Sequence, residues 1–373
     1  MSLSEEAKRY DKVLLEVESS LSELFTKLSP LNVSEEKKRF FSGEAKNPVF
    51  SYEPANAWVL VNDKLESLKQ IKLPEGDIYS ALLVEKREQL SATALLLDSI
   101  GKDEFTFFSE RLYGKPDKGL MEKALKILHE NSVKGEKTCD VKTLGSPDIM
   151  KAMQEALAKS GLPYWKVEES DITALAAVYS ATKKVYVRKR AAVSPGVLKG
   201  LVVHEIGTHV FRAANGEAQD YKLFITGFPG YLLTEEGVAA NVEEMHGCLC
   251  EERMKVFAGR VVAVGNSYKS FREVFEILKK FFSDEEAWNL TLRAKRGLRD
   301  TFLPGGYTKD LVYLKGYYDV KEYLEKNGKD ALRKLFYGKV GLEHVGVLEK
   351  LEGLKEPKHL PDGEGLKESI KGI

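Results

Sequence analysis

Cysteine is scarce in this chain, which has Cys139, Cys248 and Cys250 among 373 residues. Three cysteines provide no disulfide framework, so we expect the chain to fold in a reducing compartment and assign it to the cytoplasm. Neither sign of charge is in excess, because 57 Lys and Arg residues balance 57 Asp and Glu residues. This balance argues against a nucleic-acid partner, since neutralising phosphates requires a surplus of positive charge.

Long apolar runs are also missing. No stretch of the sequence is apolar over enough residues to cross a bilayer, so we expect no membrane partner. The first 21 residues are polar with helical spacing, and they lack the basic start and apolar middle of a signal peptide. Apolar residues still make up 43% of the chain, enough for a globular protein of one or two domains with a large buried core.

The apolar spacing divides the chain into two regions. Helical periodicity over about 4–28, 78–97 and 118–129 predicts an N-terminal helical region at 1–135. A charged stretch rich in turn-forming residues, 132–146, marks a domain or subdomain boundary. We assign 136–373 to a second region, with the alternative that both regions pack as one domain.

Short strands follow this boundary. A helix is predicted at 148–159, with Ser146 as its cap and Pro147 in its first turn. The strands that we expect lie at 164–167, 174–179 and 184–187, and a hairpin turn at 180–182 joins the last two. The last strand is expected to line a cleft and to pair with an extended peptide backbone.

A long helix comes next and carries the string HEIGTH. Ser194 is a suitable cap, Pro195 suits the first helical position, and Asn215-Gly216 is a stop signal. The chain after about residue 235 is mostly helical. This order of elements predicts an α+β fold that is mostly helical, with a small antiparallel sheet beside the HEIGTH helix.

HEIGTH supplies His204, Glu205 and His209. Two imidazoles and a carboxylate are common ligands of catalytic zinc, and they leave a fourth position open for water. The familiar helical zinc motif spaces its histidines four residues apart, whereas here they are five apart, which separates them by about 140° on a regular helix. An extra residue in the turn restores a common face, and Gly207 tolerates the distortion. We therefore predict a π-bulge or local unwinding between Glu205 and His209.

A third ligand is available in TEEG at 234–237, which offers Glu235 and Glu236 at the start of another helix capped by Thr234. The intervening loop of about 20 residues is long enough to bring the second helix across the first. Neighbouring carboxylates on a helix point about 100° apart, so one should reach the metal and the other should support it or act as a first-turn charge. Spacing alone does not choose between them.

Interpretations of HEIGTH without a metal compete with a metal site. Such residues also occur on exposed helix faces and in buried clusters whose hydrogen bonds are all made. Two of the chain's six histidines fall here, and the flanking residues 201–203 and 210–211 are apolar. Burying two imidazoles and a carboxylate is costly unless something compensates, and a metal ion does so. These observations favour zinc.

The chain resembles the microtubule-associated tyrosine carboxypeptidases and their microbial relatives. The motifs that carry the resemblance are HEIGTH, NGEAQDYKLFITGFPGYLLTEEGVAA (215–240), RAKRGLRDTFLPGGYTKDLVYLKG (293–316) and, more weakly, NPVFSYEP (47–54) and RLYGKPDKG (111–119). The resemblance implies a zincin-like, gluzincin-type HExxxH carboxypeptidase with one Zn²⁺ per chain. It implies His204, His209 and Glu236 as ligands, Glu205 as catalytic base, and a peptide or protein C-terminus as substrate.

A carboxypeptidase of this kind needs further groups. Zinc would lower the pKa of water and polarise the scissile carbonyl, and Glu205 would carry a proton to the leaving amine. Candidate oxyanion donors are Tyr307 and Tyr313. The guanidinium of an arginine can bind both oxygens of a free α-carboxylate. The common alternative is that such a run of charged residues forms a solvent-exposed helix face. The candidates for substrate binding are Arg188, Arg190, Arg293, Arg296 and Arg299, with Lys309 and Tyr313 added by the resemblance.

The preferred function is a zinc carboxypeptidase that removes a C-terminal residue, with tyrosine or another aromatic as one option. A zinc endopeptidase or aminopeptidase on the same scaffold fits the same residues. So does a non-catalytic protein that binds chain termini, although the presence of Glu205 beside all three ligands argues against it.

Overall fold

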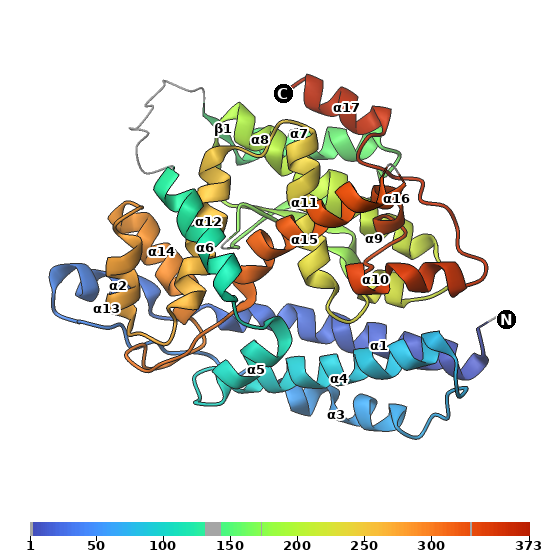
Figure 1. Ribbon diagram of the computed structural model, residues 1–373, viewed down its shortest axis with the longest axis horizontal. Coiled ribbons are helices and arrows are strands. Elements are labelled where there is room, and N and C mark those ends of the chain that lie inside the picture. The colour runs from blue at the N-terminus through green and yellow to red at the C-terminus, as the bar shows by residue number, and fades with distance from the viewer. Residues whose placement is uncertain (1–2, 131–142, 173, 329) are drawn as a thin grey trace. The chain divides into compact units, whose positions relative to one another are not determined.

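The computed structural model describes residues 3–130, 143–172, 174–328 and 330–373 (Figure 1). Cys139 and most of the boundary stretch expected at 132–146 lie outside the described residues. The chain divides into two compact units. Unit 1 contains Met1–Leu3, Glu136–Cys250 and Gly316–Ile373, and unit 2 contains Ser4–Gly135 and Glu251–Lys315. Residues 251–315 thus group with the N-terminal helices.

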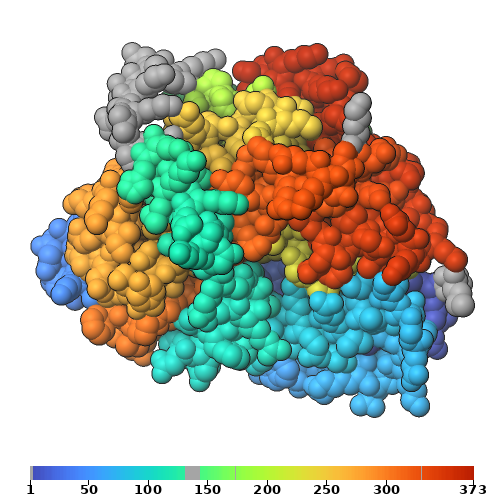
Figure 2. Space-filling model, in the orientation of Figure 1, coloured from blue at the N-terminus to red at the C-terminus, as the bar shows by residue number. Residues whose placement is uncertain are grey.

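In its described part, unit 2 is built from helices and loops, with an isolated β-bridge between Val49 and Asp300. Its elements are α1 (Glu5–Leu24), η1 (Phe25–Leu28), α2 (Val33–Ser42), α3 (Ala57–Leu68), α4 (Ile78–Asp98), α5 (Phe105–Tyr113), α6 (Lys118–Glu130), α12 (Glu251–Gly265), α13 (Phe271–Leu278), α14 (Asp284–Lys295) and η4 (Lys309–Leu311). The expected helices at 4–28, 78–97 and 118–129 are confirmed. On the face shown in Figure 2, α6 in blue-green lies against the yellow and orange segment of α12 to α14, and α6 packs on α12.

The sequence of α1 explains its position. The Ser4 hydroxyl caps the helix by accepting a hydrogen bond from the Ala7 amide at 3.1 Å. The apolar residues Ala7, Leu14, Val17 and Leu21 are buried and share one face at helical spacing. This face packs against α3 and α4, which lie beside α1 in Figure 1.

Unit 1 combines helices with two small sheets. Its elements are β1 (Leu144–Gly145), α7 (Ser146–Lys159), β2 (Lys166–Ser170), β3 (Ala176–Tyr179), η2 (Ser180–Thr182), β4 (Lys184–Arg188), β5 (Ala192–Val193), α8 (Pro195–Leu201), η3 (Val202–Val210), α9 (Phe211–Ala218), α10 (Leu223–Thr226), α11 (Tyr231–Met245), the part of α15 (Val312–Asn327) from Gly316 onward, α16 (Ala331–Leu335), η5 (Leu342–Lys350) and α17 (Glu364–Lys371). Helices predominate and the sheets have two and three strands, so the predicted α+β class is confirmed. None of the described helices has the length and apolar character needed to span a membrane.

The larger sheet is mixed, so the expectation of a purely antiparallel sheet is wrong in part. Its strand order is β2-β4-β3, and β3 pairs antiparallel with β4 across the turn at Ser180–Thr182 that the sequence predicted. β2 pairs with the other edge of β4 and runs parallel to it. Both sides of β4 are therefore occupied, and β4 cannot pair with a peptide backbone as expected.

η3 lies at the centre of unit 1. α7, α11, α17 and β3 all pack against it, so the predicted position of the sheet beside the HEIGTH helix is confirmed. The helix start is also confirmed: the Ser194 hydroxyl accepts from the Val197 amide at 3.4 Å, and Pro195 occupies the first turn.

Three predicted helix ends differ from the structure. Gly145 rather than Ser146 caps α7, because the Ser146 hydroxyl donates to Glu169 instead. α9 runs two residues past the predicted stop, since the Asn215 side chain bonds the backbone of His359 and a Cβ at Gly216 would lie 2.2 Å from the Phe224 carbonyl. Both stop-signal residues serve tertiary packing.

The start of α11 is the third case. Gly230 (φ 67°) precedes the helix, which begins at Tyr231, so Thr234 lies within it and is not its cap. The Thr234 hydroxyl instead accepts a hydrogen bond from the Leu342 amide at 2.9 Å. This contact ties α11 to η5 and places TEEG inside a formed helical turn.

Candidate metal centre

The HEIGTH helix changes its winding where the two histidines lie. η3 is a π-helix that continues α8 and runs on into α9. The ring centroids of His204 and His209 are 4.7 Å apart, with their planes at 82°. Because a π-turn accommodates an extra residue, it brings side chains five apart to the same side. The predicted distortion between Glu205 and His209 is confirmed.

Gly207 has a packing role inside this π-helix. A Cβ at Gly207 would lie 2.6 Å from Cδ2 of Leu366 in α17. The φ angle of Gly207 is not positive, so the backbone conformation itself does not require glycine. The absence of a side chain allows α17 to approach η3, which keeps the HEIGTH segment buried.

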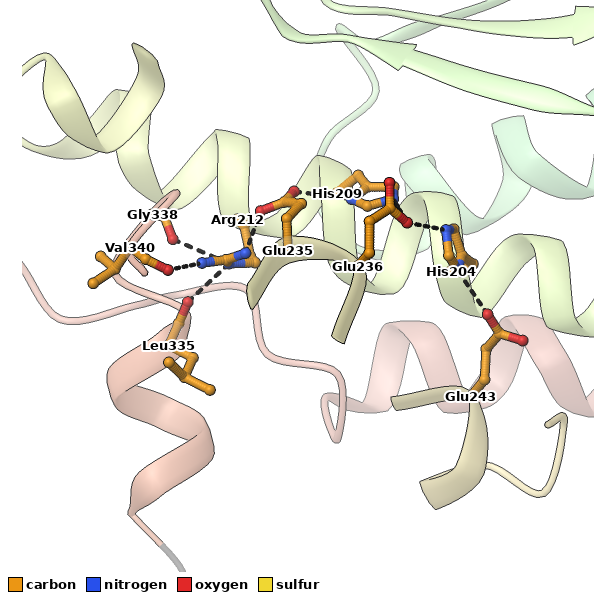
Figure 3. Close-up of polar contacts among 9 residues, drawn as sticks. All are labelled: His204, His209, Arg212, Glu235, Glu236, Glu243, Leu335, Gly338 and Val340. Carbon is orange, nitrogen blue, oxygen red and sulfur yellow. Dashed lines mark hydrogen bonds and ion pairs between the residues drawn. The ribbon is translucent and has the colours of Figure 1, made fainter. Parts of the chain in front are cut away.

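Glu236 projects from α11 towards both imidazoles (Figure 3). Its Oε2 lies 3.6 Å from Nε2 of His204 and 4.0 Å from Nε2 of His209. One ligand atom from each of the three residues lies within 4.8 Å of the other two. Ligand atoms about 2.1 Å from a tetrahedral zinc lie about 3.4 Å from one another, so the two nitrogens and one oxygen fit such an ion.

Close helix packing brings Glu236 to this position. A Cβ at Gly237 would lie 2.2 Å from the carbonyl oxygen of Gly316 in α15. The two glycines let α11 and α15 approach backbone to backbone. The EG pair of TEEG therefore combines a carboxylate with the glycine that lets its helix pack closely.

Each imidazole has a second carboxylate on its other nitrogen. Nδ1 of His204 lies 2.6 Å from Oε1 of Glu243, and Nδ1 of His209 lies 2.8 Å from Oε1 of Glu235. When Nδ1 donates to a carboxylate, Nε2 is left as the lone-pair donor, and the ring orientation is fixed. The structure thus separates the two TEEG carboxylates: Glu235 supports a histidine, and Glu236 faces both Nε2 atoms.

Glu235 is held in turn by Arg212, which is fully buried. Nη1 of Arg212 contacts Oε2 of Glu235, as Figure 3 shows. The other donors of the guanidinium bond backbone carbonyls of the chain at 335–340: Nε bonds Leu335 at 2.9 Å and Gly338 at 3.1 Å, and Nη2 bonds Val340 at 2.7 Å. Arg212 lies three residues after His209, so the same helix supplies both partners of Glu235.

The electrostatics of this cluster favour a cation. Burial opposes protonation of His204, but Glu236 and Glu243 outweigh it and raise the pKa of this imidazole to about 10. Burial would raise the pKa of Glu235, yet Arg212 and the hydrogen bond from His209 hold it below its ordinary value. The cluster therefore places Glu235, Glu236 and Glu243 around two imidazoles, and a divalent ion would offset the negative field that raises the pKa of His204.

Glu205 lies beside His204 in η3 and is 7% exposed. It adds to the negative field that raises the pKa of the His204 imidazole. The Glu205 carboxylate does not belong to the group of three ligand atoms, so it remains available for chemistry next to them.

Among the substrate-binding candidates, Arg188 is in the same unit as this cluster. It ends β4, is half-buried, and pairs in register with Ser170 of β2. Its neighbour Arg190 has a positive φ of 57° and is exposed. The remaining candidates belong to unit 2.

Four of the unit 2 candidates come together. Arg293 forms a two-point contact with Asp310, and Arg296 lies over the ring of Tyr307, with Cζ 4.8 Å from the ring centroid. Tyr313 stacks on Phe257. Arg299 is exposed, and Nζ of Lys309 lies 5.9 Å from the ring centroid of Phe25.

Tyr307 is 1% exposed, and its hydroxyl donates to the Tyr113 hydroxyl at 3.4 Å. Burial raises the pKa of this phenol well above its ordinary value. A deeply buried hydroxyl bonded within unit 2 is poorly suited to be an oxyanion donor, whereas Tyr313 is half-buried.

Sequence reasoning missed Glu243 and Arg212. A signal existed for Glu243, because it follows Glu236 by seven residues, two helical turns, and therefore shares its face. Arg212 had no local signal, since the carbonyls that it bonds lie more than 120 residues later.

Comparison with known proteins agrees with the motifs. The family model described as microtubule-associated tyrosine carboxypeptidase matches residues 38–369. The chain is 33% identical over 187 residues to MATCAP2 of Mus musculus, which covers 47% of this chain and 35% of that protein. It is 33% identical over 168 residues to microtubule-associated tyrosine carboxypeptidase 1 of Rattus norvegicus (41% and 34%). The human protein of the same name is 31% identical over 177 residues (44% and 36%).

These matches span about a third of the length of the curated relatives. The family model is more extensive and takes in every motif that carried the resemblance, from NPVFSYEP to the segment at 293–316. The chain therefore belongs to the microtubule-associated tyrosine carboxypeptidase family.

Proposed function

We propose that this protein is a zinc-dependent carboxypeptidase of the HExxxH type, in which His204, His209 and Glu236 bind one Zn²⁺. The observation that supports this proposal most strongly is the convergence of three ligand atoms from two crossing helices within 4.8 Å. A second carboxylate on Nδ1 of each histidine is the arrangement typical of histidines that bind zinc. A satisfied structural cluster has no need of three carboxylates around two imidazoles.

The proposed mechanism assigns a role to each side chain. The chemistry that a zinc ion supplies here is Lewis acidity towards water and the scissile carbonyl. The Glu205 carboxylate accepts a proton from the attacking water and passes it to the leaving amine nitrogen. Glu243 and Glu235 fix the tautomers of His204 and His209, and Arg212 holds Glu235 in place. Burial of the cluster strengthens these electrostatic contacts.

The proposed substrate is the C-terminal residue of a peptide or protein, and tyrosine is the first side chain to test. Relatives that match the chain are named tyrosine carboxypeptidases. Because the matches cover about a third of those proteins, the activity and the substrate belong to this proposal. A cytoplasmic location also belongs to it, on the basis of the scarce cysteines and the microtubule-associated relatives.

The test uses matched peptides that end in tyrosine with a free or an amidated C-terminus. We expect the zinc-loaded protein to release one residue from the free peptide and none from the amidated one, detected by mass spectrometry. Internal cleavage of the amidated peptide would indicate an endopeptidase, and loss of the first residue an aminopeptidase. Zinc binding without any cleavage would indicate a non-catalytic protein that binds chain termini.

Glu205→Gln tests the catalytic base. This variant should retain one zinc per chain and lose turnover, because the amide cannot accept the proton. Glu155→Gln, a change of the same type at an exposed position on α7, is the matched control and should retain turnover. Turnover by Glu205→Gln at the control rate would remove Glu205 from the mechanism.

A further inference from the structure

Three arginines of unit 2 surround a single carboxylate. Arg293 holds Asp310 through two parallel hydrogen bonds, Nε to Oδ2 at 2.5 Å and Nη2 to Oδ1 at 2.6 Å. Nε of Arg260 lies 3.9 Å from the same Oδ2. Asp310 acts electrostatically on Arg260, Arg293 and Arg296 alike. One negative charge thus faces three positive charges.

Arg260 and Arg296 both lie over aromatic rings, and Arg260 also makes the longer 3.9 Å contact with Asp310. Cζ of Arg260 lies 4.2 Å from the ring centroid of Tyr313, and Cζ of Arg296 lies 4.8 Å from that of Tyr307. Within the described residues, Nε of neither arginine has a hydrogen-bond partner, although both atoms are buried. Stacking on a ring orients a guanidinium but satisfies none of its N–H donors.

The surroundings disfavour this surplus of positive charge. Burial, followed by the charge of Arg293, lowers the pKa of both Arg260 and Arg296 below the ordinary value. The same arginines hold the pKa of Asp310 far below its usual range, so the negative charge of Asp310 already interacts with all three of them. A second anion would offset the repulsion that remains.

Solvent reaches this cluster, which a binding site requires. The side chains of Arg260 and Arg293 are 18% and 25% exposed, whereas that of Asp310 is 2% exposed. The two arginines are therefore more accessible to an anion from solvent than Asp310 is.

We propose that Arg260 and Arg296 form a binding site for a carboxylate carried by a peptide, with Arg293 and Asp310 as its fixed base. Two guanidiniums, each held by a tyrosine ring, can offer forked donors to one carboxylate. Arg293 already binds a carboxylate in this manner, which favours a planar carboxylate over a tetrahedral phosphate. The site goes beyond the proposed reaction, because it requires neither the metal nor turnover.

The structure changes which arginines of unit 2 are candidates for binding a carboxylate. Asp310 occupies Arg293, and Arg299 is exposed and outside the cluster. Among the unit 2 candidates Arg296 remains, and Arg260 of α12 joins it.

Calorimetric titration of the full chain tests this site. The protein carries Glu205→Gln, so that peptides persist, and is measured before and after treatment with a chelator. Three acetylated peptides are compared: a neutral peptide with a free C-terminus, the same peptide amidated, and an amidated peptide with one internal glutamate. We expect one or both carboxylate-bearing peptides to bind more tightly than the neutral amidated one, and the comparison identifies a terminal or a side-chain carboxylate as the ligand.

Arg260→Gln and Arg296→Gln should each weaken binding of the carboxylate-bearing peptide by about 10- to 100-fold, with or without chelator, because each removes charge-assisted hydrogen bonds. The matched control is Arg9→Gln, the same change at an exposed position on α1, which should leave affinity unchanged. Arg260→Lys and Arg296→Lys keep the charge and lose the fork, so they should show smaller losses, and they serve if a glutamine variant fails to fold.

Three outcomes overturn the proposal. Equal affinity of the amidated and carboxylate-bearing peptides excludes a carboxylate site. Unchanged affinity in the arginine variants places binding elsewhere, and loss of the arginine dependence after chelation assigns it to the metal centre. Displacement of the peptide by inorganic phosphate at lower concentration than by acetate identifies a phosphate site instead.

Discussion

The histidine cluster of unit 1 and the arginine cluster of unit 2 are built on the same plan with opposite charge. In unit 1, Arg212 is fully buried and holds Glu235, while Glu236 and Glu243 contact the imidazoles. In unit 2, the buried Asp310 holds Arg293, while Arg260 and Arg296 retain unsatisfied donors. Each cluster contains one closed ion pair, in which the two charges neutralise each other. The remaining charged groups form a surplus, which is negative in unit 1 and positive in unit 2.

This comparison separates two roles that charged residues often share. The closed pair fixes the backbone segments around it, since breaking a buried pair leaves an uncompensated charge. On the two proposals made above, the surplus charges determine the sign of the ligand, which is a cation in unit 1 and an anion in unit 2. Substitutions in the pair and in the surplus should therefore have different consequences.

The largest effect should come from the surplus side of unit 1. Glu236→Gln replaces the carboxylate that faces both Nε2 atoms, at 3.6 Å and 4.0 Å, with a neutral amide. We expect zinc affinity to fall by more than about 100-fold, the upper range for loss of a supporting contact, and turnover to disappear. Zinc content after dialysis against a competing chelator measures the effect. Zinc retention equal to that of the control Glu155→Gln would remove Glu236 from the ligand set.

The closed pair of unit 2 should affect stability next. Asp310→Asn leaves Arg293 without its carboxylate at a site where Asp310 is 2% exposed. We expect a loss of about 3 kcal/mol in the free energy of unfolding at pH 7, because a buried charge is left uncompensated. Chemical denaturation measures it, and Asp284→Asn, at an exposed position in the first turn of α14, is the matched control.

The same pair predicts a pH dependence. The folded state lowers the pKa of Asp310 below its unfolded value, so the stabilisation is complete above the unfolded pKa of about 3.9 and is lost as the pH falls below it. Between pH 5 and pH 8, the difference in stability between the wild type and Asp310→Asn should stay constant. A difference that changes with pH across this range would contradict the assignment.

A smaller effect should come from a supporting contact of the histidine cluster. Glu243→Gln keeps a hydrogen-bond acceptor near Nδ1 of His204 but removes its charge, so we expect zinc affinity to fall by about 10- to 100-fold without loss of the fold. The matched control is Glu244→Gln, because the neighbouring Glu244 contacts Tyr317 and Lys321 instead. Competition with a chromogenic zinc chelator distinguishes the two variants. Equal affinities would mean that Glu243 is only a structural neighbour.

Local periodicity explains which parts of both clusters could be predicted. The five-residue spacing of His204 and His209 required an extra residue in the turn, and the π-helix contains it. Helical spacing also gave the positions of α1, α4 and α6, because buried residues recur in each at intervals of three and four. These features follow from distances within one or two turns of a helix.

Contacts between distant segments explain what could not be predicted. Arg212 is satisfied by carbonyls between Leu335 and Val340, and no local pattern links the two. The Thr234 hydroxyl bonds Leu342, so a residue that suits a helix cap lies inside α11 instead. Glycines at close helix contacts have the same origin, since the neighbour that excludes a side chain belongs to another part of the chain.

The smallest effect should come from such a glycine. Gly207→Ala adds a Cβ that would lie 2.6 Å from the end of the Leu366 side chain, so α17 must shift slightly or Leu366 must change its rotamer. We expect a loss of about 1–2 kcal/mol in the free energy of unfolding, as is usual for overpacking against a side chain that can move. Gly237→Ala would meet the Gly316 backbone at 2.2 Å and should cost more, because backbone cannot yield in the same way. Denaturation of the two variants gives this order. If Gly207→Ala is the more destabilising, the π-helix itself, rather than the approach of α17, requires glycine at that position.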